Sequence, residues 1–134
     1  MNGLWETLWN MSEPGQLLRD EPMSRHTTFR IGGPADMMFF PAMEQQIALA
    51  IRLALDYHIP YTVIGNGSNL IVRDGGVIGL VIALGERFSH ISIENNVLTA
   101  EAGATLSKVA TEAQRAGLSG LEFASGIPGT LGGG

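Results

Sequence analysis

Two short glycine-rich loops contain the residues of this sequence that are best suited to binding a ligand. The first loop is Gly65-Asn66-Gly67-Ser68-Asn69-Leu70, and the second is Gly126-Ile127-Pro128-Gly129-Thr130, which continues to Gly132 and Gly133. In the first loop, successive backbone N–H groups can form an anion-binding nest, and the side chains of Ser68 and Asn69 add donors toward a pyrophosphate. In the second, Ile127 between a glycine and a proline leaves a rigid backbone along which a planar ring can lie. The pair therefore predicts a site for an anionic ligand that carries a ring system.

Both loops also have a purely structural explanation. A turn rich in Gly and Asn between two strands accounts for the first loop, and a simple cap after a short apolar strand accounts for the second. The first loop is not a dinucleotide fingerprint or a P-loop, because it is expected between strands and lacks the Lys-Ser/Thr ending. A third small-residue stretch, 100–104, meets the start of a helix, where free N–H groups can face a phosphate. Close packing of helix on strand is the favoured explanation there.

The composition excludes several classes of function. The chain has 134 residues, 45% of them hydrophobic, which is enough for one domain with its own core. A net charge of −5 with only eight Lys and Arg argues against a nucleic-acid surface. There is no cysteine, and His26, His58 and His90 have no partner at ligand spacing, so we expect no metal site. Without a membrane-spanning run or a secretory signal, the sequence predicts a cytoplasmic protein with no membrane partner.

The hydrophobic pattern predicts an α+β fold. We expect helices at 1–11, 43–58 and 104–116, a possible short helix at 16–19, and strands at 36–40, 61–64, 70–72, 79–84, 91–93 and 97–101. Gly117 stands where a helix C-cap belongs. These elements divide into an N-terminal extension, 1–19, and two small α+β lobes, 20–84 and 85–134, of which the second is incomplete. Trp5 and Trp9 in the extension are interpreted as packing anchors.

Arg30 precedes Gly32 and Gly33 and could contact a phosphate, although a lone arginine is more often a surface group. Arg25 and Arg73 are weaker candidates. Glu122 stands on the approach to the second loop, where a salt bridge or a helix-capping role is expected.

Three strings together resemble a known family. They are Thr28-Phe29-Arg30-Ile31-Gly32-Gly33-Pro34-Ala35, the first loop, and the run from Gly117 through Leu121-Glu122-Phe123-Ala124-Ser125 to Gly133. In order and spacing they closely resemble the UDP-N-acetylenolpyruvoylglucosamine reductases, flavoproteins with the PCMH-type, or vanillyl-alcohol-oxidase-type, FAD-binding fold. The resemblance covers nearly everything after Leu18. It departs at Gly134, where the family usually has a small residue such as alanine that opens the next segment.

The resemblance implies FAD held between two α+β lobes, with the pyrophosphate on 65–69 and the isoalloxazine or its linker near 126–130. It implies an oxidoreductase of peptidoglycan synthesis, and hence of cell wall biogenesis, cell shape and cell division. NADPH is the implied hydride donor, and UDP-N-acetylglucosamine enolpyruvate is the implied substrate that becomes UDP-N-acetylmuramate. The serine, glutamate and arginine that the family uses for catalysis lie beyond Gly134, so no catalytic residue is assigned and this chain alone is expected to be inactive. Two other hypotheses stay open: a non-catalytic flavin- or nucleotide-binding module completed by a partner, and another flavin oxidase of the same fold.

Overall fold

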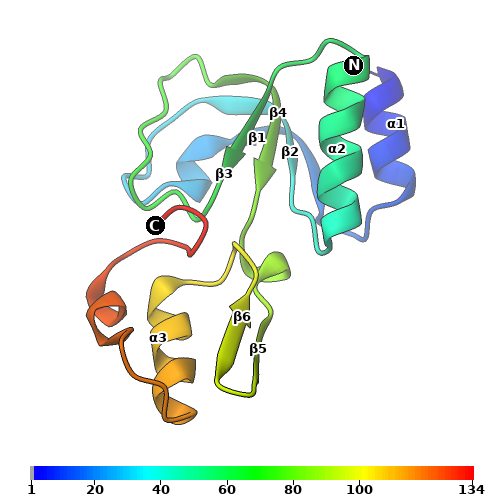
Figure 1. Cartoon of the computed structure of the whole chain (residues 1–134). Coiled ribbons are helices and arrows are strands. Elements are labelled where there is room, and N and C mark those ends of the chain that lie inside the picture. Colours follow the sequence, from blue (N-terminus) through cyan, green and yellow to red (C-terminus); the bar gives the residue numbers. More distant parts are fainter. Residues whose placement is uncertain (1) are drawn as a thin grey trace.

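The computed structural model describes residues 2–134 as a mixed α+β structure (Figure 1). Its helices are α1 (Asn2–Asn10), α2 (Glu44–Asp56) and α3 (Leu106–Arg115), and its strands are β1 (Leu17–Pro22), β2 (Pro34–Phe39), β3 (Tyr61–Ile64), β4 (Val77–Ala83), β5 (Ile91–Glu94) and β6 (Val97–Ala100). Short 3-10 helices occupy Met23–His26, Glu86–Phe88 and Glu122–Gly126. The three long helices and most strands lie where the sequence pattern predicts them, and their ends differ by a few residues. No helix within residues 2–134 is both long and apolar enough to cross a membrane.

A four-stranded sheet, in the order β1-β2-β4-β3, organises the first two-thirds of the chain. Strand β1 pairs with β2 in the antiparallel sense, whereas β2, β4 and β3 run parallel to one another. The carboxyl ends of the three parallel strands consequently meet at one edge of the sheet. In open sheets with parallel strands, ligands bind in the crevice outside this edge.

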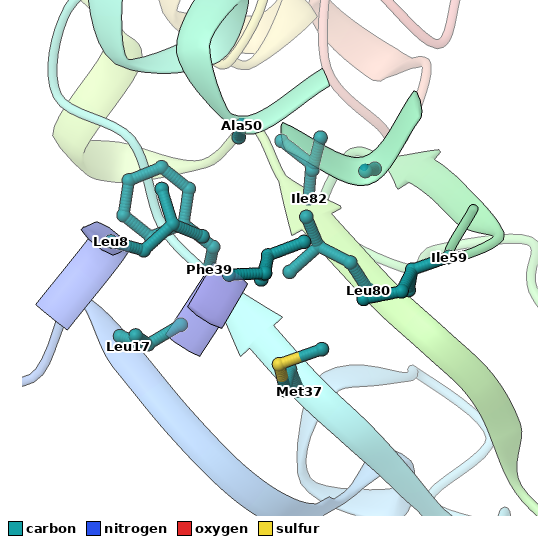
Figure 2. Close-up of a cluster of buried hydrophobic side chains, with 10 residues drawn as sticks. Leu8, Leu17, Met37, Phe39, Ala50, Ile59, Leu80 and Ile82 are labelled. Carbon is teal, nitrogen blue, oxygen red and sulfur yellow. The ribbon is translucent and has the colours of Figure 1, made fainter. Parts of the chain in front are cut away.

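One face of the sheet is covered by α1 and α2, which lie side by side (Figure 1). Figure 2 shows the core between these helices and the sheet. Its buried side chains come from both layers: Leu4, Leu8, Leu17, Met37, Phe39, Ala50, Ala54, Ile59, Leu80 and Ile82. The opposite face carries a second core cluster, in which Met23 from the first 3-10 helix and Val72 from a loop cover Ala35, Met38, Val81 and Ala83. No long helix within residues 2–134 contributes to this second cluster.

The last third of the chain consists of a hairpin, a helix and an irregular segment. Strands β5 and β6 pair antiparallel around Asn95 and Asn96, which both adopt positive φ. Helix α3 begins at Thr105, whose side chain accepts a hydrogen bond from the Lys108 N–H. It ends in a Schellman motif, in which the N–H groups of Gly117 and Leu118 donate to the carbonyls of Gln114 and Ala113.

Two expected elements are wrong. The possible helix at 16–19 is instead the start of β1, because residues 17–19 pair with β2 and Leu17 becomes buried in the core. The expected strand at 70–72 does not form, and these residues run as a loop over the second face of the sheet. There Val72 is 7% exposed, and the Arg73 carbonyl accepts hydrogen bonds from Gly33 N–H and Gly76 N–H.

The two tryptophans of α1 differ in how far they are buried. Trp5 packs partly against the core, and the Arg19 guanidinium lies 4.1 Å from the centre of its ring. Trp9 stacks on Trp5 with ring centres 5.6 Å apart, but 55% of Trp9 is exposed. Trp5 is therefore a packing anchor, and Trp9 is not.

Candidate functional site

The first glycine loop follows β3 directly, at the edge where the parallel strands end. The second loop reaches this edge from the far end of the chain. A Cβ on Gly65 would clash with Oγ1 of Thr130, and a Cβ on Gly129 would lie 3.2 Å from Oγ of Ser68. The fold thus brings together two loops that are more than fifty positions apart in the sequence.

The second loop is held in place by the start of α3. The Leu106 N–H donates to the Gly129 carbonyl, and the Leu131 N–H donates to the Ala104 carbonyl. Thr130, which is 3% exposed, forms an isolated antiparallel bridge with Thr105. The second loop is therefore fixed to the start of α3, and its 126–128 segment is exposed to solvent.

The first loop is docked on the segment before β2. Gly67 has φ +71°, and a Cβ at this position would clash with the His26 carbonyl. The Gly67 carbonyl accepts a hydrogen bond of 3.1 Å from the Thr28 N–H. Only glycine fits both the backbone conformation and the close approach, so packing alone accounts for this residue.

A cleft of about 980 Å³ opens beside the first loop. Its wall is built from the 24–30 segment, from Phe40 after β2, from Gly65 and Asn66 after β3, and from the end of β4 through Arg87. Three of these four parts of the wall, those after β2, after β3 and at the end of β4, lie at the carboxyl ends of the parallel strands. The cleft is therefore the crevice that the sheet topology predicts for a ligand.

The cleft concentrates positive charge in an acidic chain. Arg25, Arg30 and Arg87 line it together with His26, and Glu86 is the carboxylate in the lining. Three of the eight Lys and Arg residues of a chain with net charge −5 are thus collected around one cavity. Such a local excess attracts an anion against the overall charge.

A neighbouring carboxylate orients part of this lining. Glu21 Oε1 lies 2.9 Å from Nε2 of His26 and 3.9 Å from Nη1 of Arg25. The Glu21 side chain is only 13% exposed, so it is a structural partner of the cleft rather than a solvated surface charge. The ring of His26 also packs at 5.5 Å from that of Phe40.

The sequence indicates little of this lining. It draws attention to His26 only as a possible metal ligand, makes Arg25 a weak candidate, and gives no sign of a role for Arg87. Within residues 2–134 there is no group of three His, Cys, Asp or Glu side chains that could hold a metal ion. The one local sign of a cationic lining is the run from Arg25 to Arg30, which contains three basic side chains just before Gly32 and Gly33.

At two glycines of the site, a Cβ would meet no other part of the chain. Nothing lies within 4 Å of a Cβ built on Gly85 or on Gly126, and neither residue has positive φ. Gly85 lines the cleft and Gly126 belongs to the second loop. At both positions the absent side chain leaves space that a bound molecule can use.

Other candidate residues have roles in packing. Leu70 packs against the second core cluster, and a Cβ on Gly132 would clash with the side chain of Ala102. Gly133 is exposed at the end of the second loop. In the third small-residue stretch, a Cβ on Gly103 would clash with the carbonyls of Gly85 and Phe88, so this glycine packs closely on the segment of the 3-10 helix Glu86–Phe88 rather than between a helix and a strand.

Comparisons with known proteins show the family to which the chain is similar. The model of the FAD binding domain family matches residues 35–134. The UDP-N-acetylenolpyruvoylglucosamine reductase of Alkaliphilus oremlandii is 53% identical over 117 residues, which are 87% of this chain and 38% of that protein. The reductase of the same name from Clostridioides difficile is 44% identical over 130 residues, 97% of this chain and 43% of that protein. The chain thus spans about two-fifths of the length of these relatives.

Solved structures agree with both sequence comparisons. The crystal structure of UDP-N-acetylenolpyruvylglucosamine reductase from Thermus caldophilus superposes with a TM-score of 0.66 at 35% identity, covering 87% of this chain and 39% of that one. Alkyldihydroxyacetonephosphate synthase superposes with a TM-score of 0.73 over 99% of this chain and 28% of its own, at 19% identity. This second likeness concerns the fold alone.

Proposed function

The chain belongs to the FAD-binding domain family, and on this premise we propose that it forms the FAD-binding, N-terminal portion of a UDP-N-acetylenolpyruvoylglucosamine reductase. The observation that carries the proposal is the meeting of the two glycine loops, Gly65 against Thr130, beside a cationic cleft at the carboxyl edge of the sheet. The residue types of each loop favour a ligand-binding role, and the fold brings the two loops into contact.

The residues present suit the parts of FAD. The first loop, Gly65 to Leu70, offers backbone N–H groups and the side chains of Ser68 and Asn69 to the pyrophosphate, and the arginines of the cleft add positive charge. Gly85 leaves free space in the wall of the cleft. In the second loop, Gly126, Ile127, Pro128, Gly129 and Thr130, with Gly132 and Gly133, form the side on which the flavin ring or its linker lies. The two lobes, 20–84 and 85–134, then hold the cofactor between them, with 1–19 as an extension of the first.

The complete protein would carry out the reaction that the names of the relatives describe. When bound, FAD supplies hydride transfer from NADPH to the enolpyruvyl group of UDP-N-acetylglucosamine enolpyruvate. The product, UDP-N-acetylmuramate, is a precursor of peptidoglycan, which places the activity in the cytoplasm and links it to cell shape and division. No metal, nucleic acid or membrane partner is required for this chemistry.

The contribution of the 134 residues is to bind FAD and to orient its flavin ring. They provide donors for the phosphates, a rigid loop for the ring and a site shielded on one side by the sheet. We assign no proton donor among them, and without one the chain alone does not complete the reaction.

Two measurements test the proposal. Titration of the chain with FAD, followed by quenching of flavin fluorescence, should show saturable binding, and a longer protein that includes this sequence should convert UDP-N-acetylglucosamine enolpyruvate with oxidation of NADPH. A longer protein that binds no flavin would disprove the assignment. If a longer protein binds FAD but leaves this substrate unchanged, the proposed flavin site stands and the proposed reductase activity is disproved.

A further inference from the structure

The first glycine loop contains a side-chain amide, that of Asn66, that can be lost in a spontaneous reaction without any ligand or enzyme. Asn66 is exposed and is followed directly by Gly67, which has no side chain to hinder approach of its nitrogen to the Asn66 amide carbon. In such pairs the backbone nitrogen of the glycine attacks Cγ of the asparagine. A new C–N bond forms, the bond from Cγ to Nδ2 breaks, and the proton lost from the Gly67 nitrogen passes through solvent to the departing Nδ2 group, which leaves as ammonia.

The resulting five-membered succinimide then takes up one water. Water opens the ring at either carbonyl carbon, which yields aspartate or isoaspartate in place of asparagine. The net change is loss of ammonia and gain of water, with no oxidant, reductant or enzyme involved. A neutral amide becomes a carboxylate.

The local structure favours this reaction at Asn66. The Ser68 N–H donates a hydrogen bond of 3.3 Å to Oδ1 of Asn66, which holds the side-chain amide folded back along the Gly67 backbone. The same N–H stabilises the negative charge that develops on Oδ1 when the nitrogen attacks Cγ. Within residues 2–134, the Gly67 N–H donates to no carbonyl or side-chain oxygen, so no hydrogen bond has to be broken to free the nucleophile.

The other asparagine of the same loop provides an internal comparison. Asn69 is also exposed, but it is followed by Leu70, whose branched side chain hinders the attack. Asn69 also lacks the hydrogen bond from the backbone two residues later that Asn66 has.

We propose that Asn66 is a site of spontaneous deamidation, and that its conversion to aspartate or isoaspartate weakens binding of an anionic ligand in the cleft. Asn66 lines the same cleft as the arginines, so the new carboxylate would add negative charge to that cleft and oppose binding of an anionic ligand. Isoaspartate would also lengthen the backbone by one carbon next to Gly67, which is packed against His26. The modification itself is independent of the proposed function, whereas its effect on binding rests on it.

One digest reports both asparagines. Cleavage after Arg52 and Arg73 releases residues 53–73, which contain Asn66 and Asn69 and no other cleavage site of this kind. The folded chain is incubated at mildly alkaline pH, samples are digested at low pH, and fragment masses locate the exchange of NH₂ for OH. A sample taken at time zero and digested in the same way corrects for deamidation during handling, and isoaspartyl methyltransferase labels the isoaspartate product.

Conversion at residue 66 should be several-fold faster than at residue 69, and Asn66→Gln should abolish the fast signal because the ring it would form is larger. Equal rates at the two positions would overturn the proposal. Aged chain should bind FAD on the order of tenfold more weakly than fresh chain, and saturating FAD should slow the conversion. If fresh chain binds no FAD, the proposed function fails while fast conversion at Asn66 still stands.

Discussion

Oγ1 of Thr130 occupies the space in which a Cβ on Gly65 would lie, so the two glycine loops pack closely against each other at these residues. We therefore expect Gly65→Ala to destabilise the chain by about 1–3 kcal/mol, the usual cost of overpacking. Thr130→Ala removes the clashing oxygen, and the double variant should lose less stability than the sum of the two single variants. Urea unfolding of all four proteins measures this coupling. Additive losses would show that the two residues are not in contact.

Filling the cleft should weaken FAD binding. A Cβ on Gly85 meets no protein atom within 4 Å, and Gly85 lines the cleft, so Gly85→Val should weaken FAD binding by about tenfold or more. Its melting temperature should stay near that of the parent. Gly75→Val is the matched control, because Gly75 is equally open but lies outside the cleft. Equal FAD affinity of the two variants would place the cofactor elsewhere.

That residues 65–70 and 126–130 form turned loops could be predicted because the signal is local. Gly65, Asn66 and Gly67 tolerate turn conformations that most residues avoid, and Pro128 fixes its own φ. The helices α2 and α3 were predictable for a similar reason, since their apolar positions repeat with the helical period.

The missed features depend on contacts between distant residues. The segment at 16–19 has only two adjacent apolar residues, Leu17 and Leu18, and it becomes a strand only by pairing with β2. Val72 lies in a short apolar run typical of a strand, yet the run is used to cover a sheet face. Arg25 and Arg87 are more than sixty positions apart, and nothing in either local sequence indicates a shared cleft.

The C-termini of α2 and α3 allow a paired test of backbone strain. Both helices end with the same two hydrogen bonds, but the residue in the left-handed conformation is His58 after α2, with φ +55°, and Gly117 after α3, with φ +74°. A residue with a Cβ costs about 1 kcal/mol in this conformation. Gly117→Ala should therefore destabilise the chain by about 1 kcal/mol, and His58→Gly should stabilise it by somewhat less, because glycine also loses more entropy on folding. Denaturant unfolding curves measure both changes, and a destabilised His58→Gly variant would mean that the imidazole makes a contact worth more than the strain.

Cationic attraction in the cleft should be visible as a salt dependence of FAD binding. Arg30 lines the cleft, whereas Arg52 lies on α2, away from the cleft. Because a charged hydrogen bond to a phosphate contributes about 1.5–3 kcal/mol, Arg30→Gln should raise the dissociation constant of FAD by about tenfold or more. It should also flatten the dependence of affinity on ionic strength, since one of the interacting charges is gone. Arg52→Gln removes the same charge from the chain but should leave both the affinity and its salt dependence close to those of the parent. If the two variants weakened binding equally, net charge rather than the cleft would account for the attraction, and the assignment of the phosphates to this crevice would have to be abandoned.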